Sequence, residues 1–138
     1  MPPMIELGHG THVGLRRTRN EDTYHADIGC GLFLVADGMG GHQQGDLAAA
    51  LARDAVVAAV HTGQDLNQAI GQAATCLADS PRQRAELAPM GTTIAALRVR
   101  ADGWQVAWVG DSRIYRWQRE LEQVSHDHSL VQELVEAG

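Results

Sequence analysis

Lysine is absent from the 138-residue sequence, and all eleven basic residues are arginine. Seventeen acidic residues outnumber them, so the formal net charge is −6 at pH 7. This negative charge disfavours nonspecific binding to nucleic acid, because phosphates repel an acidic surface. Intrinsic disorder is excluded as the default state, because 44% of the residues are hydrophobic and only 20% are charged. The length is that of one ordinary globular domain.

Cysteine and long apolar runs are also scarce. The two cysteines, Cys30 and Cys76, have neither the CxxC spacing of a redox or zinc motif nor the number expected of a disulfide framework. We expect free thiols in a reducing compartment, with a single disulfide between the two as the alternative. No apolar stretch reaches the ~20 residues of a spanning helix, and the starting MPPM lacks the basic and apolar regions of a signal peptide. We therefore expect a soluble cytoplasmic protein without a membrane partner.

Residues 46–61 and 66–78 both carry apolar side chains at helical spacing. Asp46 is the predicted N-cap at the start of the first helix and Asp65 the predicted N-cap before the second, and Gly63 ends the first helix. Short apolar and β-branched runs predict strands at 31–36, 92–100, 104–109, 112–117 and 121–124, with a looser strand at 4–15. The remaining predictions are loops at 16–23 and 37–42 and a last helix over 129–136. This order of elements predicts an α+β fold.

An aspartate stands at the end of the predicted strand 31–36. Asp37 follows directly, and Gly38 beside it permits close approach of the backbone. A carboxylate on a rigid element, with a carbonyl oxygen next to it, suits hard cations such as Mg²⁺ and Mn²⁺. An ordinary Asp-Gly turn is an equally good interpretation of this pair taken alone.

Two further acidic groups repeat this chemistry. Asp111 follows the apolar strand predicted at 104–109, where the alternative is a β-bulge. Glu21 and Asp22 lie beside arginines, where the alternative is a solvated loop with ordinary ion pairs. The planar fork of an arginine such as Arg17 matches a phosphate group. Together the three groups predict metal-assisted phosphoester hydrolysis, which needs no protein nucleophile because the cations activate water.

Other motifs carry less weight. The glycine-rich stretch 38–45 lacks the GxxxxGK[ST] pattern of a P-loop, and no GxSxG motif occurs. The HDH triplet at 126–128 resembles a zinc or general-base cluster. Because it precedes Ser129, a natural N-cap, a structural role at a helix start is favoured. Four isolated histidines are weak signals: His9, His12, His25 and His61.

Five motifs follow one another along nearly the whole chain. They are RTRNED at 17–22, LFLVADGMGGHQQGDLAA at 32–49, GTTIAAL at 91–97, WVGDSRIYRW at 108–117 and SHDHSLVQELVEAG at 125–138. In this order they strongly resemble the metal-dependent serine/threonine protein phosphatases of the PPM (type 2C) family, in its bacterial branch.

The resemblance implies an incomplete αββα sandwich, in which two antiparallel sheets are flanked by helix pairs. It also implies two Mn²⁺ or Mg²⁺ ions, with a third, weaker ion in the complete domain. The implied roles are bridging of both ions by Asp37, coordination of one by the Gly38 carbonyl, coordination through a water by Glu21, support of these ligands by Asp22, phosphate binding by Arg17 and binding of the third ion by Asp111.

The implied reaction is hydrolysis of phosphoserine or phosphothreonine in a protein substrate by a metal-bound hydroxide, opposing a bacterial protein kinase. Where eukaryotic members have a histidine general acid, this sequence has Met39, and His42 nearby is not assigned that role.

The family continues past the position of Gly138, and its later segments supply two further aspartates of the metal site. We therefore expect residues 1–138 to be a PPM-type phosphatase domain that is truncated at its C-terminus and incomplete for activity. The alternative is a non-catalytic fragment or pseudo-phosphatase that binds a phosphoprotein or another partner.

Overall fold

The computed structural model describes residues 4–17, 20–40, 45–79 and 90–136. Along this part of the chain two strands come first, two helices follow, and the remaining elements are strands. In order they are β1 (Asp22–Asp27), β2 (Leu32–Gly40), α1 (Gly45–His61), α2 (Leu66–Ala78), β3 (Met90–Thr92), β4 (Ile94–Arg100), β5 (Gly103–Gly110), β6 (Tyr115–Trp117), β7 (Leu121–Gln123) and β8 (His128–Glu136).

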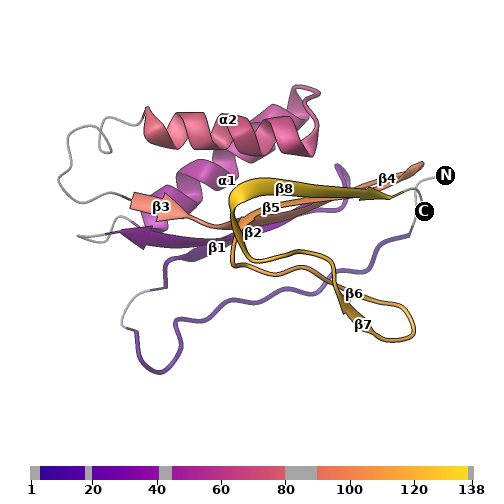
Figure 1. The fold of residues 1–138 in the computed structure, drawn as a ribbon, viewed down its shortest axis with the longest axis horizontal. Coiled ribbons are helices and arrows are strands. Elements are labelled where there is room, and N and C mark those ends of the chain that lie inside the picture. Colours follow the sequence, from indigo (N-terminus) through magenta and orange to yellow (C-terminus); the bar gives the residue numbers. More distant parts are fainter. Residues whose placement is uncertain (1–3, 18–19, 41–44, 80–89, 137–138) are drawn as a thin grey trace.

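Most of the strands form one antiparallel sheet in the order β1-β2-β4-β5-β8, with β3 paired to the end of β2. Strands β6 and β7 form a separate two-stranded sheet. Both helices lie on one face of the larger sheet and pack against each other (Figure 1). The predicted α+β fold is therefore confirmed.

The main core lies between the helices and the centre of the large sheet. Strand β2 alternates, because Leu32, Leu34 and Ala36 are buried while Val35 between them is 49% exposed. Helix α1 turns a row of mostly small side chains towards this surface: Ala49, Ala52, Val56, Ala59 and Val60. Since alanine projects little from the helix, α1 packs closely onto β2, which carries Asp37.

The two predicted helices are confirmed, α2 with the same bounds and α1 beginning one residue earlier. Asp65 caps α2 by accepting a hydrogen bond from the Gln68 N–H at 2.8 Å, while the Gln68 Oε1 accepts one from the Asp65 N–H at 3.1 Å. This reciprocal pair satisfies two N–H groups that the first helical turn leaves free. Gly63, with φ of +93°, ends the turn after α1. Neither helix has the length and apolar character needed to cross a membrane, as far as the described residues go.

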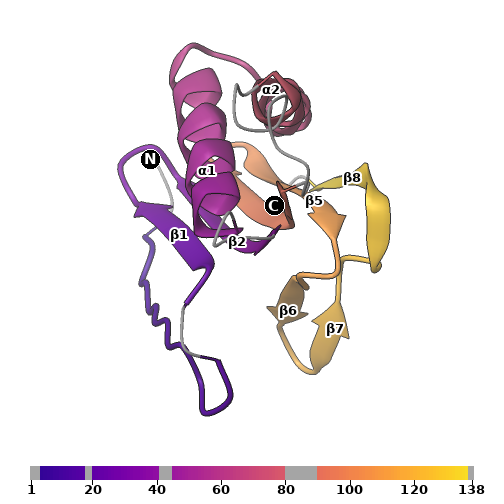
Figure 2. The same cartoon turned by 90° about the vertical axis from the view of Figure 1, so that its left-hand side faces the viewer.

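A second, smaller core lies on the other face of the sheet. Ala95, Val106 and Trp108 are buried there, and the Trp108 Nε1–H donates to the His126 carbonyl at 2.6 Å. Figure 2 shows the β6–β7 hairpin and the segment before β1 on this side, away from the helices. The sheet is therefore covered unequally, by two helices on one face and by irregular segments on the other.

The strand predicted at 4–15 is wrong, since these residues form no strand in the structure. Three glycines in the segment weaken any strand, and the hydrogen bond that the Gly14 N–H donates to the His12 Nδ1 is local. The polar residues 22–27, by contrast, form β1 because every one of them has a partner on β2. The loop predicted at 16–23 therefore ends at Glu21, and its last two residues belong to β1.

Two other predicted boundaries also move. Strand β2 runs on to Gly40, so the predicted loop 37–42 is wrong at its first four residues, and the last two lie outside the described residues. Pairing with β3 extends β2 here. The strand predicted at 112–117 shortens to Tyr115–Trp117.

The last predicted helix is also wrong, because residues 128–136 form β8. This strand pairs antiparallel with β5, from Trp104 opposite Glu136 to Gly110 opposite His128. An edge strand offers a row of unpaired N–H and C=O groups. Pairing with that edge overrides the helical spacing of apolar residues in this segment.

Candidate metal centre

The acidic residues predicted from separate motifs meet where β1 begins. Asp22, the first residue of β1, lies directly opposite Asp37 of β2. Burial raises the pKa of Asp37 above its usual range, and a hydrogen bond with Asp22 and the charge of that carboxylate raise it further. Two carboxylates held together in this way favour either a shared proton or a bound cation.

Glu21, the residue before β1, contacts the backbone next to Asp37. Its carbonyl accepts a hydrogen bond from the Gly38 N–H at 3.0 Å, and its Oε2 is buried without a hydrogen-bond partner among the described residues. A buried carboxylate oxygen without a partner is costly. A cation at this position would remove that cost.

Two buried glycines let Glu21, β2 and the start of α1 lie close together. A Cβ added to Gly45 would strike this carboxylate, and a Cβ added to Gly38 would strike the Gly45 carbonyl oxygen. The start of α1 therefore rests directly on the backbone of β2. Gly45 did not emerge from the sequence as a site residue, although it ends the glycine-rich stretch that the sequence analysis considered.

Thr93 is a further residue that the sequence analysis did not assign to the site. Its Oγ1 accepts from the Asp37 N–H at 3.1 Å, and its own N–H donates to the Asp37 carbonyl at 2.9 Å. The same Oγ1 lies 2.6 Å from the Oγ of Ser112. Thr93 is 4% exposed, so this bridge between the Asp37 strand and the Asp111 loop is buried. The GTT motif at 91–93 was the only signal for it.

Asp111 follows β5 after Gly110, whose φ is +95°. The pairing of β5 with β8 shifts register between Trp108 and Gly110, which marks a β-bulge or another irregularity just before Asp111. Asp111 is exposed, and its charge contributes to the raised pKa of Asp37. The irregularity at the end of β5 therefore does not prevent Asp111 from lying close enough to Asp37 to influence its pKa.

Arg17 is exposed in the segment before β1, and its charge opposes the other effects by lowering the pKa of Asp37. Asn20 ties this segment to the site, because its Nδ2–H donates to the Thr11 Oγ1 at 2.8 Å and its Oδ1 accepts from the Asp22 N–H at 3.0 Å. A cleft of about 350 Å³ lies between this segment and strands β1 and β2. Its lining includes Thr11, His12, Asp22, Asp37 and Ser112.

Of the HDH triplet, neither His126 nor Asp127 is among the described residues that line this cleft. Arg113 donates two hydrogen bonds to the Asp127 carboxylate, from Nε at 3.1 Å and from Nη2 at 2.9 Å. The hydrogen bond from Arg113 lowers the pKa of Asp127. The predicted role at a helix start is therefore wrong, because residues 128–136 form β8 and Asp127 pairs with Arg113 instead. His42 lies outside the described residues.

These residues fit a divalent cation. Asp22 and Asp37 contact each other, the Glu21 oxygen is buried and unpaired, and all three donors are hard oxygens of the kind that Mg²⁺ and Mn²⁺ take. An arginine and a third aspartate lie within electrostatic reach. The structure therefore brings together Arg17, Asp22, Asp37 and Asp111, with Glu21 and Gly38 alongside.

The sequence is similar to known bacterial phosphatases. It is 36% identical over 146 residues to the protein phosphatase PhpP of Streptococcus pneumoniae, covering 97% of this chain and 59% of that protein. It is 33% identical over 135 residues to the serine/threonine protein phosphatase PstP of Mycobacterium tuberculosis, covering 91% of this chain and 25% of PstP. The chain thus spans only part of the length of these relatives.

Solved structures of the same kind share the fold. The catalytic domain of PstP in complex with two manganese ions matches with a TM-score of 0.72 and 31% identity, over 84% of this chain and 53% of that chain. A bacterial serine phosphatase carrying one substitution matches with a TM-score of 0.79 and 26% identity, over 93% of this chain and 69% of that chain. The sequence model of protein phosphatase 2C matches residues 10–135. The chain therefore belongs to the protein phosphatase 2C family.

Proposed function

We propose that this chain carries part of the active site of a metal-dependent phosphatase that acts on phosphoserine and phosphothreonine in proteins. The observation that carries the proposal is the contact between the Asp22 and Asp37 carboxylates. The buried, unpaired Glu21 oxygen, which lies against Gly45 where α1 meets Gly38, adds to it. The similarity to PstP and PhpP, which are named as protein phosphatases, supports the same reaction.

The residues divide the work by their chemistry. Asp37 and the Gly38 carbonyl would hold Mn²⁺ or Mg²⁺, with Glu21 acting through a water, while Asp22, directly opposite Asp37 in the sheet, would support these ligands. When bound, such cations lower the pKa of water and neutralise charge on a transferring phosphoryl group. Asp111 would hold a third, weaker ion.

Arg17 would bind the phosphate of the substrate. Arg17 is exposed, and its positive charge lies close enough to Asp37 to lower the pKa of that residue. Its guanidinium is therefore placed to meet an anion bound near Asp37. A planar guanidinium donates two parallel hydrogen bonds to phosphate. A phosphoprotein substrate, a cognate serine/threonine kinase that phosphorylates it and a cytoplasmic location complete the proposal.

The test is hydrolysis of a phosphothreonine peptide with Mn²⁺, comparing the wild-type chain with Asp37→Asn. Loss of one ligand removes several kcal/mol of charge stabilisation, so we expect a rate at least ~100-fold lower. Asp102→Asn is the matched control, because Asp102 lies in an exposed turn between β4 and β5. This control keeps the wild-type rate.

PhpP assayed alongside sets the scale, since this chain covers 59% of that protein and is expected to act far more slowly. Calorimetry with Mn²⁺ separates the two candidate functions. Wild-type chain that neither binds Mn²⁺ nor exceeds Asp37→Asn in rate would support a non-catalytic module that binds a phosphoprotein or another partner.

A further inference from the structure

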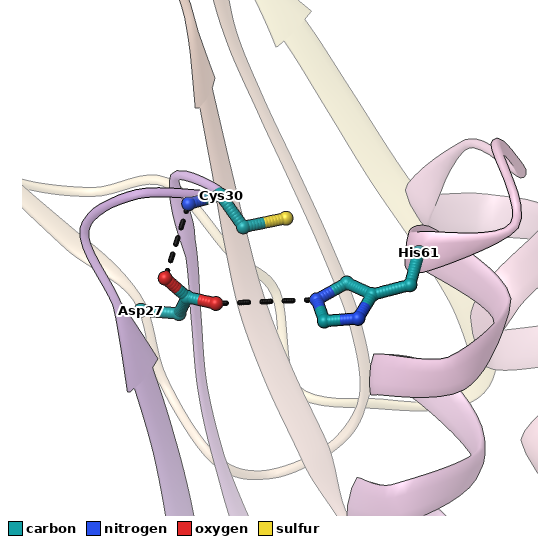
Figure 3. Close-up of side chains that lie close together, drawn as sticks. All are labelled: Asp27, Cys30 and His61. Carbon is teal, nitrogen blue, oxygen red and sulfur yellow. Dashed lines mark hydrogen bonds and ion pairs between the residues drawn. The ribbon is translucent and has the colours of Figure 1, made fainter.

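Three potential metal ligands of different chemistry meet away from the cleft. They are Asp27 at the end of β1, Cys30 in the turn before β2, and His61 at the end of α1, as Figure 3 shows. One ligand atom from each lies within 4.8 Å of the other two. The Asp27 Oδ2 faces the His61 Nε2 at 3.9 Å. Neither the family motifs nor the proposed function uses any of these side chains.

We propose that Asp27, Cys30 and His61 bind one transition-metal dication, with Zn²⁺ as the best match. Thiolate, imidazole and carboxylate are the ligand types that Zn²⁺ takes, and three of them leave a fourth position for water. Bond lengths of about 2.0–2.3 Å require ligand atoms roughly 3.3–3.8 Å apart. Closing the cluster therefore needs only small side-chain rotations. One thiolate and one carboxylate balance the charge of the ion.

The backbone around Cys30 already holds the ligands in place. The Cys30 N–H donates to the Asp27 Oδ1 at 3.1 Å, which leaves Oδ2 turned towards His61 (Figure 3). The Cys30 carbonyl accepts from the Arg98 Nε at 3.0 Å, and the Gly31 carbonyl accepts from the Val99 N–H at 2.7 Å. Hydrogen bonds that orient a ligand in this way raise metal affinity.

The helix end favours the same ion. His61 is the last residue of α1, and the free carbonyls of a helix C-terminus carry partial negative charge that attracts cations. Bound there, the metal would join the end of α1 to the turn between β1 and β2. Its binding would displace one proton from the Cys30 thiol.

This cluster is separate from the carboxylate cleft. Asp27 and Asp22 stand at opposite ends of β1, which places them about 17 Å apart at ~3.4 Å per residue. The two sites also differ in chemistry, because a thiolate and an imidazole suit Zn²⁺ while the proposed ligands of the cleft are all oxygens.

The experiment uses Co²⁺ as a coloured substitute for Zn²⁺ on the reduced, metal-free 138-residue chain. Cobalt bound to a thiolate gives a charge-transfer absorption that a purely oxygen-ligated ion lacks. We expect the wild type to bind one equivalent of Co²⁺ with this absorption, and we expect Zn²⁺ to displace the cobalt. It is lost in Cys30→Ser and kept in Cys76→Ser, the matched control at the exposed second cysteine.

Two further variants separate a three-ligand site from a lone reactive thiol. His61→Gln and Asp27→Asn should each weaken Co²⁺ binding at least ~10-fold. The His61 side chain is 54% exposed, so its replacement leaves the fold intact and carries the test if Cys30→Ser does not fold. Asp37→Asn keeps the absorption, because it alters only the cleft. The proposal fails if the wild type shows no such absorption, or if His61→Gln and Asp27→Asn bind Co²⁺ as the wild type does.

Discussion

One buried hydroxyl connects the two acidic motifs of the cleft. The Thr93 Oγ1 accepts from the Asp37 N–H and contacts the Oγ of Ser112, next to Asp111. The residue thus fixes the strand that presents one carboxylate and the loop that presents another. Its importance depends on contacts with residues 56 and 19 positions away, which spacing alone does not reveal.

Thr93→Val should destabilise the protein by about 1–3 kcal/mol, because it keeps the shape but leaves the Asp37 N–H without an acceptor. Mn²⁺ affinity should fall with it. Thr93→Ser, which keeps the hydroxyl, is the control and should lose only about 1 kcal/mol for the missing methyl group. Urea unfolding and Mn²⁺ calorimetry measure both effects. Equal stability of the Val and Ser variants would contradict a role for the hydroxyl.

The raised pKa of Asp37 predicts how the metal-free protein responds to pH. Between the pKa of Asp37 in the unfolded chain and its higher pKa in the folded chain, the folded state binds more protons. The free energy of unfolding therefore increases as the pH falls through this window, and the contribution is lost as the pH rises through the folded pKa.

Asp37→Asn removes this dependence. We expect the variant to be more stable than the wild type near neutral pH without metal, and the difference to shrink as the pH falls towards the usual pKa of aspartate, about 4. Urea unfolding in a chelator at a series of pH values measures the difference, in which the other titrating groups cancel. A difference in the free energy of unfolding that stays constant over this range would contradict a raised pKa of Asp37 in the folded protein.

At the scale of elements, the sequence predicted what local patterns control. The spacing of apolar residues located both helices, and the Asp65 cap marked the start of α2. Strand β1 was missed because DTYHAD contains no apolar run, and its pairing with β2 decides its structure. The last segment was predicted as a helix because its apolar residues fit that period, whereas the free edge of β5 determines the outcome.

The β8 pairing makes a prediction that only a strand satisfies. Gln105 and Val135 are directly opposite in the register, and opposite Cα atoms of antiparallel strands lie about 4.5–5.5 Å apart, within disulfide reach. Gln105→Cys with Val135→Cys, in a chain whose Cys30 and Cys76 are serine, should cross-link under mild oxidation.

The matched control moves one cysteine out of register. Gln105→Cys with Leu134→Cys should cross-link poorly, because successive residues of a strand face opposite sides of the sheet. Mass spectrometry of the oxidised chains compares the two pairs. Equal yields would indicate that residues 128–136 do not hold this register.

At the scale of the whole molecule, the β1–β2 hairpin carries both candidate metal sites, one at each end. The sequence motifs predicted the acidic residues of the cleft, because the carboxylate side chains and the order of the motifs along the chain were enough to single them out. They could not indicate the Asp27, Cys30 and His61 cluster, whose members come together only when α1 packs over the hairpin. Isolated histidines and cysteines therefore carried too little signal in the sequence.

Two sites so far apart should stabilise the fold independently. At free Mn²⁺ or Zn²⁺ about 100-fold above its dissociation constant, each ion adds about 2.7 kcal/mol to the free energy of unfolding. Together they should add their separate effects to within about 0.5 kcal/mol. Urea unfolding with each ion and with both measures this. Asp37→Asn should lose only the Mn²⁺ effect and Cys30→Ser only the Zn²⁺ effect, and a Zn²⁺ effect that disappears when Mn²⁺ is present would indicate one shared site.

The position of β2 between β1 and β4 has a consequence for synthesis on the ribosome. Strand β2 pairs with β1, which precedes it, and with β4, which follows only after both helices. Contacts between distant parts of a chain form slowly, and a nascent chain emerges from its N-terminus. The helical layer therefore emerges while one edge of β2 is still bare, and Asp37 receives the Thr93 hydroxyl only after residue 93 has left the ribosome. The support that Thr93 gives to Asp37 is therefore added only after the whole helical layer has been synthesised.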